Sequence, residues 1–378
     1  MSGRVLIAVT HLLGIGHLVR ARHLAGALAQ AGYEVVLASG GMPDGRAANG
    51  YRFVQLPPVR VVGTDFRNLL DEEAERATPE RLGAREAGLA ALARELRPDI
   101  VITEHFPFGR RQLAGEFLAL IEAARAARPQ VVVLSSIRDV LVAPLRPERL
   151  AEAHRRLEDL FDGVLVHGDR AFLPLEASWP VPPALAERLH YTGYLAAPAP
   201  VAEDPAASGG ILVSGGGSAA ALPLFRLALA AAELLPAQDW HLLVGHGVAE
   251  PDFAVLLRQA PANAVVERAR PDFPALLRNC ALSLSLAGYN TVLDLVQAGP
   301  RALVAPFDAG NETEQAIRAA ALERAGLARL LRPEAGPGVL VAAIDEVLAG
   351  GRPQRVSVDL DGAAGAVAAV RRLATKRR

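Results

Sequence analysis

The stretch Cys280–Gln315, CALSLSLAGYNTVLDLVQAGPRALVAPFDAGNETEQ, decides the fold expected for this chain. It begins with an apolar run at 281–286, which predicts a short buried strand. Gly288 then marks a tight turn, and 290–298 has the spacing of a helix. A strand, a glycine turn and a helix start form a common phosphate site, because the first helical turn leaves backbone N–H groups unpaired and carries a partial positive charge.

Polar side chains follow this turn at positions that suit a nucleotide. Asn290 or Thr291 is expected to cap the helix, and both side chains can donate to a phosphate oxygen. Asp294, one turn further along, could accept hydrogen bonds from a ribose diol. A second strand at 301–306 leads to the polar loop AGNETEQ, expected beside the same helix start. An ordinary βαβ unit with a capped helix and a solvated loop would explain the same residues without a ligand.

Composition limits the class of protein. The chain has 378 residues, of which 51% are hydrophobic, so it is long enough for two domains with buried cores. Its 40 basic and 41 acidic residues give a net charge of −1, which argues against a nucleic-acid-binding surface. The single cysteine, Cys280, excludes an intramolecular disulfide and a CxxC metal site, and is expected to fill the core.

The cellular location is expected to be the cytoplasm. The opening MSGRVLIAVT runs directly into a predicted strand and lacks the cleavage signal of a secretory peptide. No apolar run approaches the roughly 18 residues needed to span a bilayer.

The first half of the chain opens as a βαβ unit. An apolar run at 4–10 predicts a strand buried on both faces, followed by a loop with Gly14 and Gly16, a helix, and a strand at 34–38. Ser39 stands where a dinucleotide fold has its acidic residue, which argues against NAD.

His17 directly follows this glycine pair. Its imidazole titrates near neutrality and could take a proton from an acceptor hydroxyl. A histidine that only caps the helix or packs against the loop is the alternative.

Polar residues follow every predicted strand of the first half. Because strand ends in a doubly wound sheet meet at one edge, we expect an active site there. Glu104 could orient His17 or hold the acceptor, whereas Arg138 with Asp139 could be only an ion pair and His167 only a helix cap. The residues in question are Gly14, His17, Ser39, Gly40, Glu104, His105, Arg138, Asp139 and His167.

The second half restarts the same pattern after the Pro/Ala-rich linker AAPAPVAEDPAASGG. A strand at 211–213 runs into Ser214-Gly215-Gly216-Gly217-Ser218, a glycine turn before a helix. Such glycines let backbone N–H groups approach a diphosphate.

Several motifs resemble a known family. G-Y-N-T-V-L-D at 288–294, followed by P-F-x(5)-T-E-Q at 306–315, resembles the donor-binding half of GT-B glycosyltransferases of the MurG type and of the plant and antibiotic type. G-I-G-H at 14–17 resembles the glycine loop that opens their acceptor domain. With TEHFPFGRRQL, SIRDVL, VHGDR and YTGYL, the chain resembles, over nearly its whole length, a bacterial group of MurG-related glycosyltransferases.

The resemblance implies a role for each matching residue. His17 is implied as general base with Glu104 beside it, and His105, Arg138, Asp139 and His167 as the acceptor side. Asn290 and Thr291 are implied for phosphate, Asp294 for ribose, and Glu314 and Gln315 for the transferred sugar. Val266 and Arg268 are expected at the edge of the nucleotide base. The full expected donor site is Gly14, Gly16, Ser214, Gly215, Gly216, Gly217, Ser218, Val266, Arg268, Gly288, Asn290, Thr291, Asp294, Glu314 and Gln315.

The fold class expected is α/β of the GT-B type, with two Rossmann-like doubly wound domains facing a cleft. Residues 1–200 are expected to bind the acceptor, 201–355 the nucleotide sugar, and 356–378 to form a C-terminal helix that crosses back to the first domain. One departure from MurG is that YTGYLAAP lacks the arginine offered to the phosphates, so Arg138, Arg20 or the serines of SGGGS could compensate.

The reaction expected is an inverting transfer from a nucleotide-diphosphate sugar, with UDP as the implied nucleotide, to a small-molecule or lipid-linked acceptor. No cofactor, metal or nucleic acid is expected, and membrane association is compatible with the sequence but not required by it. Asp359-Leu360-Asp361 spells the DxD metal signature of a different glycosyltransferase fold and is interpreted as chance. A nucleotide-sugar hydrolase or epimerase, or a non-catalytic nucleotide-sugar sensor or scaffold, is the alternative.

Overall fold

The computed structural model describes residues 3–12, 14–62, 68–196, 209–217, 219–307, 313–332, 335–354 and 356–376. The chain divides into two compact units. The first comprises Met1–Arg170, Pro174–Leu195 and Asp359–Arg378, and the second Ala171–Leu173 and Ala196–Val358.

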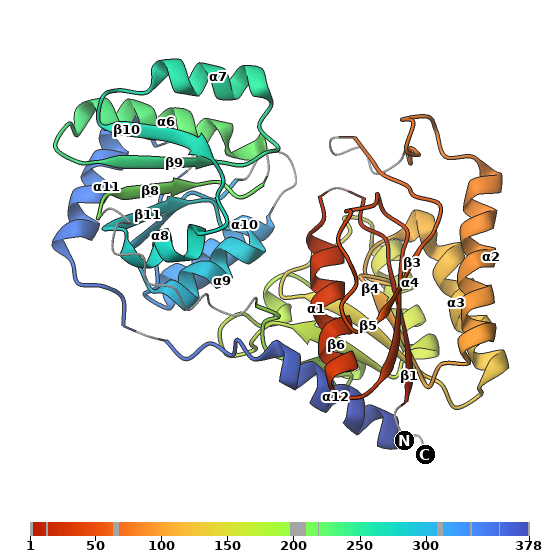
Figure 1. Cartoon of the computed structure of the whole chain (residues 1–378). Helices are drawn as coiled ribbons and strands as arrows, with labels where there is room; N and C mark the ends of the chain where they lie inside the picture. The colour runs from red at the N-terminus through yellow and green to blue at the C-terminus, as the bar shows by residue number, and fades with distance from the viewer. Residues whose placement is uncertain are drawn as a thin grey trace. The chain divides into compact units, whose positions relative to one another are not determined.

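The first unit is built on a seven-stranded parallel sheet in the order β3-β2-β1-β4-β5-β6-β7 (Figure 1). The order reverses direction between β1 and β4, so loops after these strands lie at a topological switch point. Its strands are β1 (Arg4–Val9), β2 (Glu34–Ser39), β3 (Arg52–Gln55), β4 (Ile100–Glu104), β5 (Val132–Arg138), β6 (Gly163–His167) and β7 (Leu189–Tyr191). Its α-helices are α1 (Gly16–Gln30), α2 (Pro79–Leu96), α3 (Ala114–Ala127), α4 (Pro147–Leu160), α5 (Pro183–Ala186) and α12 (Gly362–Lys376).

Helices cover both faces of this sheet, which is why its central strands read as continuous apolar runs. Alternate residues of β1 enter two different cores. Leu6 and Ala8 pack with side chains of α2, α3 and α4, whereas Val5 and Ile7 pack with side chains of α1 and α12.

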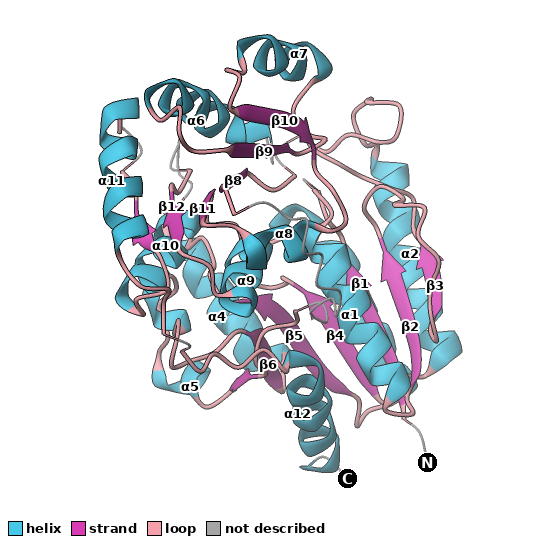
Figure 2. Cartoon of the chain, turned by 60° about the vertical axis from the view of Figure 1, so that its left-hand side comes forward, coloured by secondary structure: helices cyan, strands magenta, loops and turns pink. Residues whose placement is uncertain are grey.

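The second unit repeats the design with a six-stranded parallel sheet in the order β10-β9-β8-β11-β12-β13 (Figure 2). Its switch point lies between β8 and β11. The strands are β8 (Ile211–Ser214), β9 (Trp240–Val244), β10 (Ala264–Arg268), β11 (Leu282–Ser285), β12 (Ala302–Val304) and β13 (Arg329–Leu330). The α-helices are α6 (Leu222–Leu234), α7 (Glu250–Gln259), α8 (Phe273–Asn279), α9 (Tyr289–Ala298), α10 (Glu314–Arg324) and α11 (Pro337–Ala349).

The predicted α/β class with two Rossmann-like units is confirmed. The expected strands and helices lie close to their predicted bounds, and α2 begins and ends at the predicted residues. The three strands that the sequence did not predict, β3, β7 and β13, are short and lie at sheet edges. Edge strands carry fewer buried apolar residues, so their periodic signal is weak.

Candidate active site

His17 and Glu104 meet at the carboxyl edge of the first sheet. His17 is the second residue of α1, just after the glycine loop, and Glu104 is the last residue of β4. His17 Nδ1 lies 2.9 Å from Glu104 Oε1. The His17 side chain keeps 14% of its surface exposed, while Glu104 keeps 1%. The structure thus brings the predicted base together with the carboxylate predicted to orient it.

Arg20 completes this pair from the next turn of α1. Its guanidinium forms an ion pair with Glu104 and lies 3.0 Å from His17 Nδ1. A residue three positions after His17 shares its helix face, so the spacing contained this signal. The sequence instead suggested Arg20 as a substitute phosphate ligand, whereas in the structure its charge is directed to Glu104.

A second row of buried side chains lies behind Glu104. Ser136 Oγ donates to Glu104 Oε2 across 2.5 Å and lies 3.0 Å from His167 Nε2. His167 Nδ1 is 2.9 Å from Thr192 Oγ1. His167 has no exposed surface, so it cannot touch an acceptor directly, which corrects the expected acceptor-side role. Ser136 and Thr192 were missed because small hydroxyl residues on buried strands look like core residues.

His105 packs beside His17, with 5.1 Å between ring centroids and 55° between ring planes. Its backbone has a φ of 67°, in the left-handed region that is uncommon for a residue with a side chain. A Cβ at Gly109 would lie 2.3 Å from the His105 ring, so glycine is required there. The expected acceptor-side residue His105 therefore adjoins the His17 ring.

Burial and positive charge keep both imidazoles neutral. Burial lowers the pKa of His17 well below 6.5, and the nearby Arg110, Arg20 and Arg138 charges lower it further. Burial likewise lowers the pKa of His105. Burial also lowers the pKa of Arg110 itself to about 10. At neutral pH His17 therefore keeps a free lone pair, as a general base requires.

Arg138 and Asp139 differ in their surroundings. Arg138 is the last residue of β5, and its charge acts on both His17 and His105. Asp139 is buried, and its carboxylate accepts from the Val140 N–H at 2.9 Å and from the Tyr194 hydroxyl at 3.2 Å. Asp139 is therefore tied into the fold, while Arg138 supplies charge at the His17 edge.

The expected phosphate turn of the second unit follows β8 at Ser214. Gly216 has a φ of 65°, and a Cβ at Gly215 would lie 1.9 Å from the Ala221 Cβ. The turn after β9 packs against this one, because the Gly247 N–H donates to the Gly217 carbonyl at 3.1 Å. The predicted site residue Ser218 lies outside the described residues.

The start of α9 differs in one detail from the prediction. Gly288, which has no side chain, is the N-cap, so the prediction that Asn290 or Thr291 caps the helix is wrong. Both instead lie in the first turn. Asn290 is exposed, and Thr291 Oγ1 lies 4.0 Å from the position that a Cβ at Gly216 would take. The structure thus brings the α9 start close to the glycine turn after β8.

Further along the same helix, Asp294 is half-buried, and burial raises its pKa to about 6.

Glu314 and Gln315, expected to bind the sugar, begin α10. Glu314 is buried and paired with Arg318 at 3.4 Å. Gln315 Oε1 accepts from the N–H groups of Ala287 and Phe307, at 3.2 and 3.1 Å. The Gln315 carbonyl thus ties together the chain ends of β11 and β12.

Val266 and Arg268 lie on β10. Val266 is buried in the core. Arg268 donates to the Gly245 and Val248 carbonyls and lies over the Phe253 ring, 4.0 Å from its centroid. Their side chains are therefore engaged within the unit, and any contact with a base here would come from the backbone.

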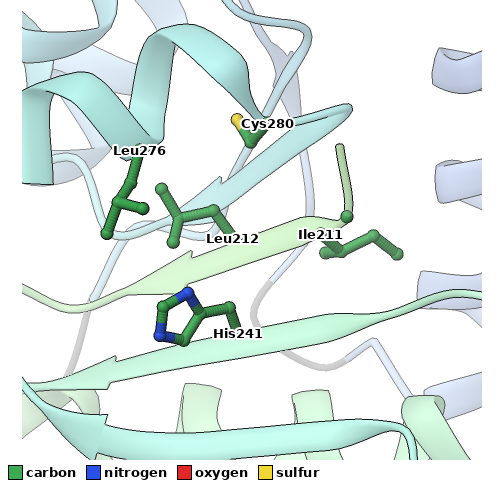
Figure 3. Close-up of a pocket in the computed structure, with 6 residues that line it drawn as sticks. Ile211, Leu212, His241, Leu276 and Cys280 are labelled. Carbon is green, nitrogen blue, oxygen red and sulfur yellow. The ribbon is translucent and has the colours of Figure 1, made fainter. Parts of the chain in front are cut away.

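The second unit contains a small cavity (Figure 3). Its lining consists of Gly210, Ile211, Leu212, His241, Leu276 and Cys280. These residues lie at the amino ends of β8, β9 and β11, opposite the glycine turns. Its volume of about 10 Å³ has room for roughly one water molecule, so it is not the donor site.

The described residues contain no group of three or more His, Cys, Asp or Glu side chains placed to hold a metal ion. No helix among them has both the length and the apolar character needed to cross a membrane.

Sequence comparison places the second unit in a family. Residues 211–357 match the glycosyltransferase family 28 C-terminal domain. A curated relative is the UDP-N-acetylglucosamine--N-acetylmuramyl-(pentapeptide) pyrophosphoryl-undecaprenol N-acetylglucosamine transferase of Synechococcus sp. (strain RCC307). It is 32% identical over 124 residues, which cover 33% of this chain and 34% of the relative. The match therefore spans about a third of that relative's length.

Structural comparison covers the whole chain. MurG of Acinetobacter baumannii has a TM-score of 0.64 at 18% identity, covering 98% of this chain and 99% of that structure. The spinosyn rhamnosyltransferase SpnG, solved with thymidine diphosphate, has a TM-score of 0.56 at 19% identity, covering 99% and 96%. The chain has the GT-B fold. The match of its second unit to the family 28 C-terminal domain and its likeness to MurG confirm the MurG-like GT-B resemblance that its motifs predicted.

Proposed function

We propose that this protein is a glycosyltransferase that moves a sugar from a nucleotide-diphosphate sugar to an acceptor hydroxyl, with inversion at the anomeric carbon. The observation that carries the proposal is the His17–Glu104 pair at the carboxyl edge of the first sheet, in a chain whose second unit is a family 28 C-terminal domain. A neutral base at that position suits deprotonation of a hydroxyl nucleophile.

The chemistry of the base follows from its contacts. A carboxylate only accepts hydrogen bonds, so Glu104, 2.9 Å from His17 Nδ1, favours a hydrogen on that nitrogen, whereas the Arg20 guanidinium, 3.0 Å away, only donates and opposes it. We infer that Arg20 directs its hydrogen to Glu104, with which it is paired, so that His17 carries its hydrogen on Nδ1 and its lone pair on Nε2. Nε2 then takes the acceptor's proton as its oxygen attacks the anomeric carbon. Glu104 stabilises the imidazolium that forms, as a carboxylate does in other histidine pairs.

The donor is held by the second unit. The glycine turn after β8 and the first turn of α9 offer backbone N–H groups and a positive helix end to the diphosphate. Asp294 accepts from the ribose diol, and the Gln315 amide donates to the sugar. We infer that these donors stabilise the departing diphosphate without a metal ion.

The other substrates follow by analogy. The nucleotide is uridine diphosphate, in line with the name of the Synechococcus relative, whose own acceptor is pyrophosphoryl-undecaprenol-linked. The acceptor of this protein is a small-molecule or lipid-linked hydroxyl compound, and we infer that the protein acts in the cytoplasm.

The test is a transfer assay with UDP-, dTDP- and GDP-sugars and a panel of acceptors. His17→Ala should lower kcat at least about 100-fold because the general base is lost, with donor affinity unchanged. His23→Ala, an exposed histidine on the same helix, is the matched control and should retain full activity. Product anomers, assigned by NMR, should be inverted relative to the donor.

Two outcomes would contradict the proposal. If His17→Ala transferred sugar with the kcat of the wild-type protein, His17 would not be the general base. Rapid release of free sugar or of an epimer without any acceptor would show a nucleotide-sugar hydrolase or epimerase instead.

A further inference from the structure

The hydrogen bonds behind Glu104 form a single buried chain. It runs from Thr192 through His167 and Ser136 to Glu104, across the end of β7, β6, β5 and β4. Glu104, Ser136 and Thr192 are each 1% exposed and His167 is 0% exposed. Buried polar groups that are fully bonded stiffen a site, whereas a broken bond there is costly.

The protonation of His167 is fixed by its surroundings. Its pKa is lowered to about 3, mainly by burial and then by the Arg20 charge, with Glu104 opposing both. Arg20 on α1 and Glu104 on β4 are charged groups that act on this ring, and the hydroxyls of Ser136 and Thr192 contact its two nitrogens. The ring is therefore neutral at any working pH, with one N–H and one lone pair.

The direction of each hydrogen bond then follows. The single hydrogen of Ser136 Oγ goes to Glu104, because a carboxylate can only accept. The Ser136 oxygen must therefore accept from His167 Nε2. The opposite tautomer would place two lone pairs against each other across 3.0 Å.

Thr192 is the start of the chain. With the ring hydrogen on Nε2, His167 Nδ1 is an acceptor, and the Thr192 hydroxyl donates to it across 2.9 Å. The hydroxyl has other acceptors nearby, the carbonyls of Gly193 at 2.9 Å and Val166 at 3.3 Å. The tautomer of His167 decides between them.

We propose that Thr192, His167 and Ser136 are positioning residues for His17: each donates to the next in that order, and the chain ends on Glu104, holding its carboxylate ready for the His17 Nδ1 hydrogen. We call this chain the Glu104 relay. Its effect on catalysis rests on the proposed function, whereas the assignment of donor and acceptor in each of its hydrogen bonds does not.

The relay predicts a specific effect on proton uptake. A hydrogen bond to a charged carboxylate favours the charged form. Without the Ser136 donor, the His17–Glu104 pair takes up a proton more readily, so the free base is lost at a higher pH. A merely structural serine would lower activity without moving the pH at which activity is lost.

The first experiment reads the hydrogens directly in the full-length, ¹⁵N-histidine-labelled protein without substrates. Long-range ¹H–¹⁵N spectra distinguish the tautomers, and His167→Gln and His17→Ala assign two of the nine histidines. We expect Nε2–H for His167 and Nδ1–H for His17. An Nδ1–H tautomer at His167 would overturn the relay.

The second experiment measures kcat/KM against pH. At low pH, kcat/KM falls as the base takes up a proton, and we call this part of the profile the acid limb. Ser136→Ala should move the acid limb to higher pH by about one pH unit. Thr192→Val should move the acid limb in the same direction. Without the Thr192 donor, the His167 ring can change tautomer and accept the Ser136 hydrogen, which is then no longer donated to Glu104. His167→Gln, whose amide N–H can replace Nε2–H, should restore most of the wild-type profile.

Ser135→Ala is the matched control, because Ser135 is the neighbouring buried serine of β5 and donates to the Phe106 carbonyl instead. Its acid limb should not move. Equal behaviour of Ser135→Ala and Ser136→Ala would overturn the relay. If the wild-type protein transfers no sugar, the proposed function fails, while the tautomers in the spectra still decide the relay.

Discussion

Asp294 shows how one residue can link ligand binding to protonation. It lies half-buried in α9, and burial raises the pKa of its carboxyl to about 6. A ribose diol would donate to the ionised form, so the donor competes with the proton for this side chain.

Nucleoside diphosphate affinity should therefore fall in mild acid. With a pKa of about 6, roughly a tenth of Asp294 is ionised at pH 5, so affinity there should be roughly tenfold weaker than well above pH 7. Isothermal titration with UDP at pH 5 to 8 measures this. Asp294→Asn should bind UDP more weakly at neutral pH. Its affinity should no longer change with pH around 6 through this side chain, so that only the ionisation of the ligand's own phosphate contributes to the pH dependence. The same pH profile in both proteins would exclude Asp294 from the donor site.

The same burial predicts a stability effect without ligand. A carboxyl with a raised pKa contributes stability that is complete at low pH and lost as pH rises through about 6. Asp294→Asn should therefore stabilise the ligand-free protein at pH 7, by up to about 3 kcal/mol, and not at pH 4. Thermal unfolding at both pH values checks this. Asp345 is an exposed residue of α11, and Asp345→Asn should leave the stability unchanged at pH 7 and at pH 4.

At this scale the sequence predicted part of the site. His17 and Glu104 could be paired in advance because each follows a strand that ends at the same sheet edge. Ser136 and Thr192 could not, since their role depends on side chains from neighbouring strands. The helix cap was assigned to Asn290 or Thr291 on residue preference, but the cap of α9 is Gly288, two residues before Asn290.

Among the elements, the two glycine turns of the second unit depend on each other. A Cβ at Gly245 would lie 2.1 Å from the Gly216 carbonyl oxygen, and one at Gly247 would lie 2.2 Å from that of Gly217. Neither contact is tolerable, so the turn after β9 sets the position of the turn after β8. The backbone N–H groups expected to bind phosphate therefore rest on the turn after β9, a contact that the sequence did not predict.

Gly245→Ala should weaken nucleoside diphosphate binding at least about tenfold, because the displaced Gly216 peptide can no longer present its N–H group. The measurement is the thermal shift produced by UDP, which reports affinity for the folded state. Gly338→Ala in α11, where a Cβ would meet nothing within 4 Å, should leave the shift unchanged. An unchanged shift in both variants would separate the turn after β9 from the donor site.

For the whole molecule, the chain end belongs to the unit that the chain begins with. α12 packs on α1 and β6, with Ala366, Ala369, Val370 and Leu373 in the core of that face. Close approach is possible because Gly365 faces the Thr192 carbonyl, where a Cβ would lie 2.0 Å from its oxygen. The last helix therefore contributes to the stability of the first unit.

Leu373→Ala should destabilise the first unit by about 2 to 4 kcal/mol, because a buried leucine over Gly163 is lost. The two tryptophans allow the units to be followed separately, since Trp179 belongs to the first and Trp240 to the second. In a Trp240→Phe background, where Trp179 reports on the first unit, Leu373→Ala should lower the urea concentration at the unfolding midpoint. In a Trp179→Phe background, where Trp240 reports on the second unit, Leu373→Ala should leave that midpoint unchanged. Arg372→Ala, the exposed neighbour, should stay within about 0.5 kcal/mol of the parent. Equal shifts in both backgrounds would contradict this division.

The sequence by itself determined the two Rossmann-like units, the glycine turns and the presence of a histidine and a carboxylate at strand ends. These follow from periodicity and from residues whose backbone preferences act locally, so they can be recognised without a neighbour. The tertiary structure alone decided that Arg20 neutralises Glu104, that His167 lies behind it, and that Gln315 ties two strand ends together. Those facts depend on distances between side chains from different elements, which no local pattern encodes.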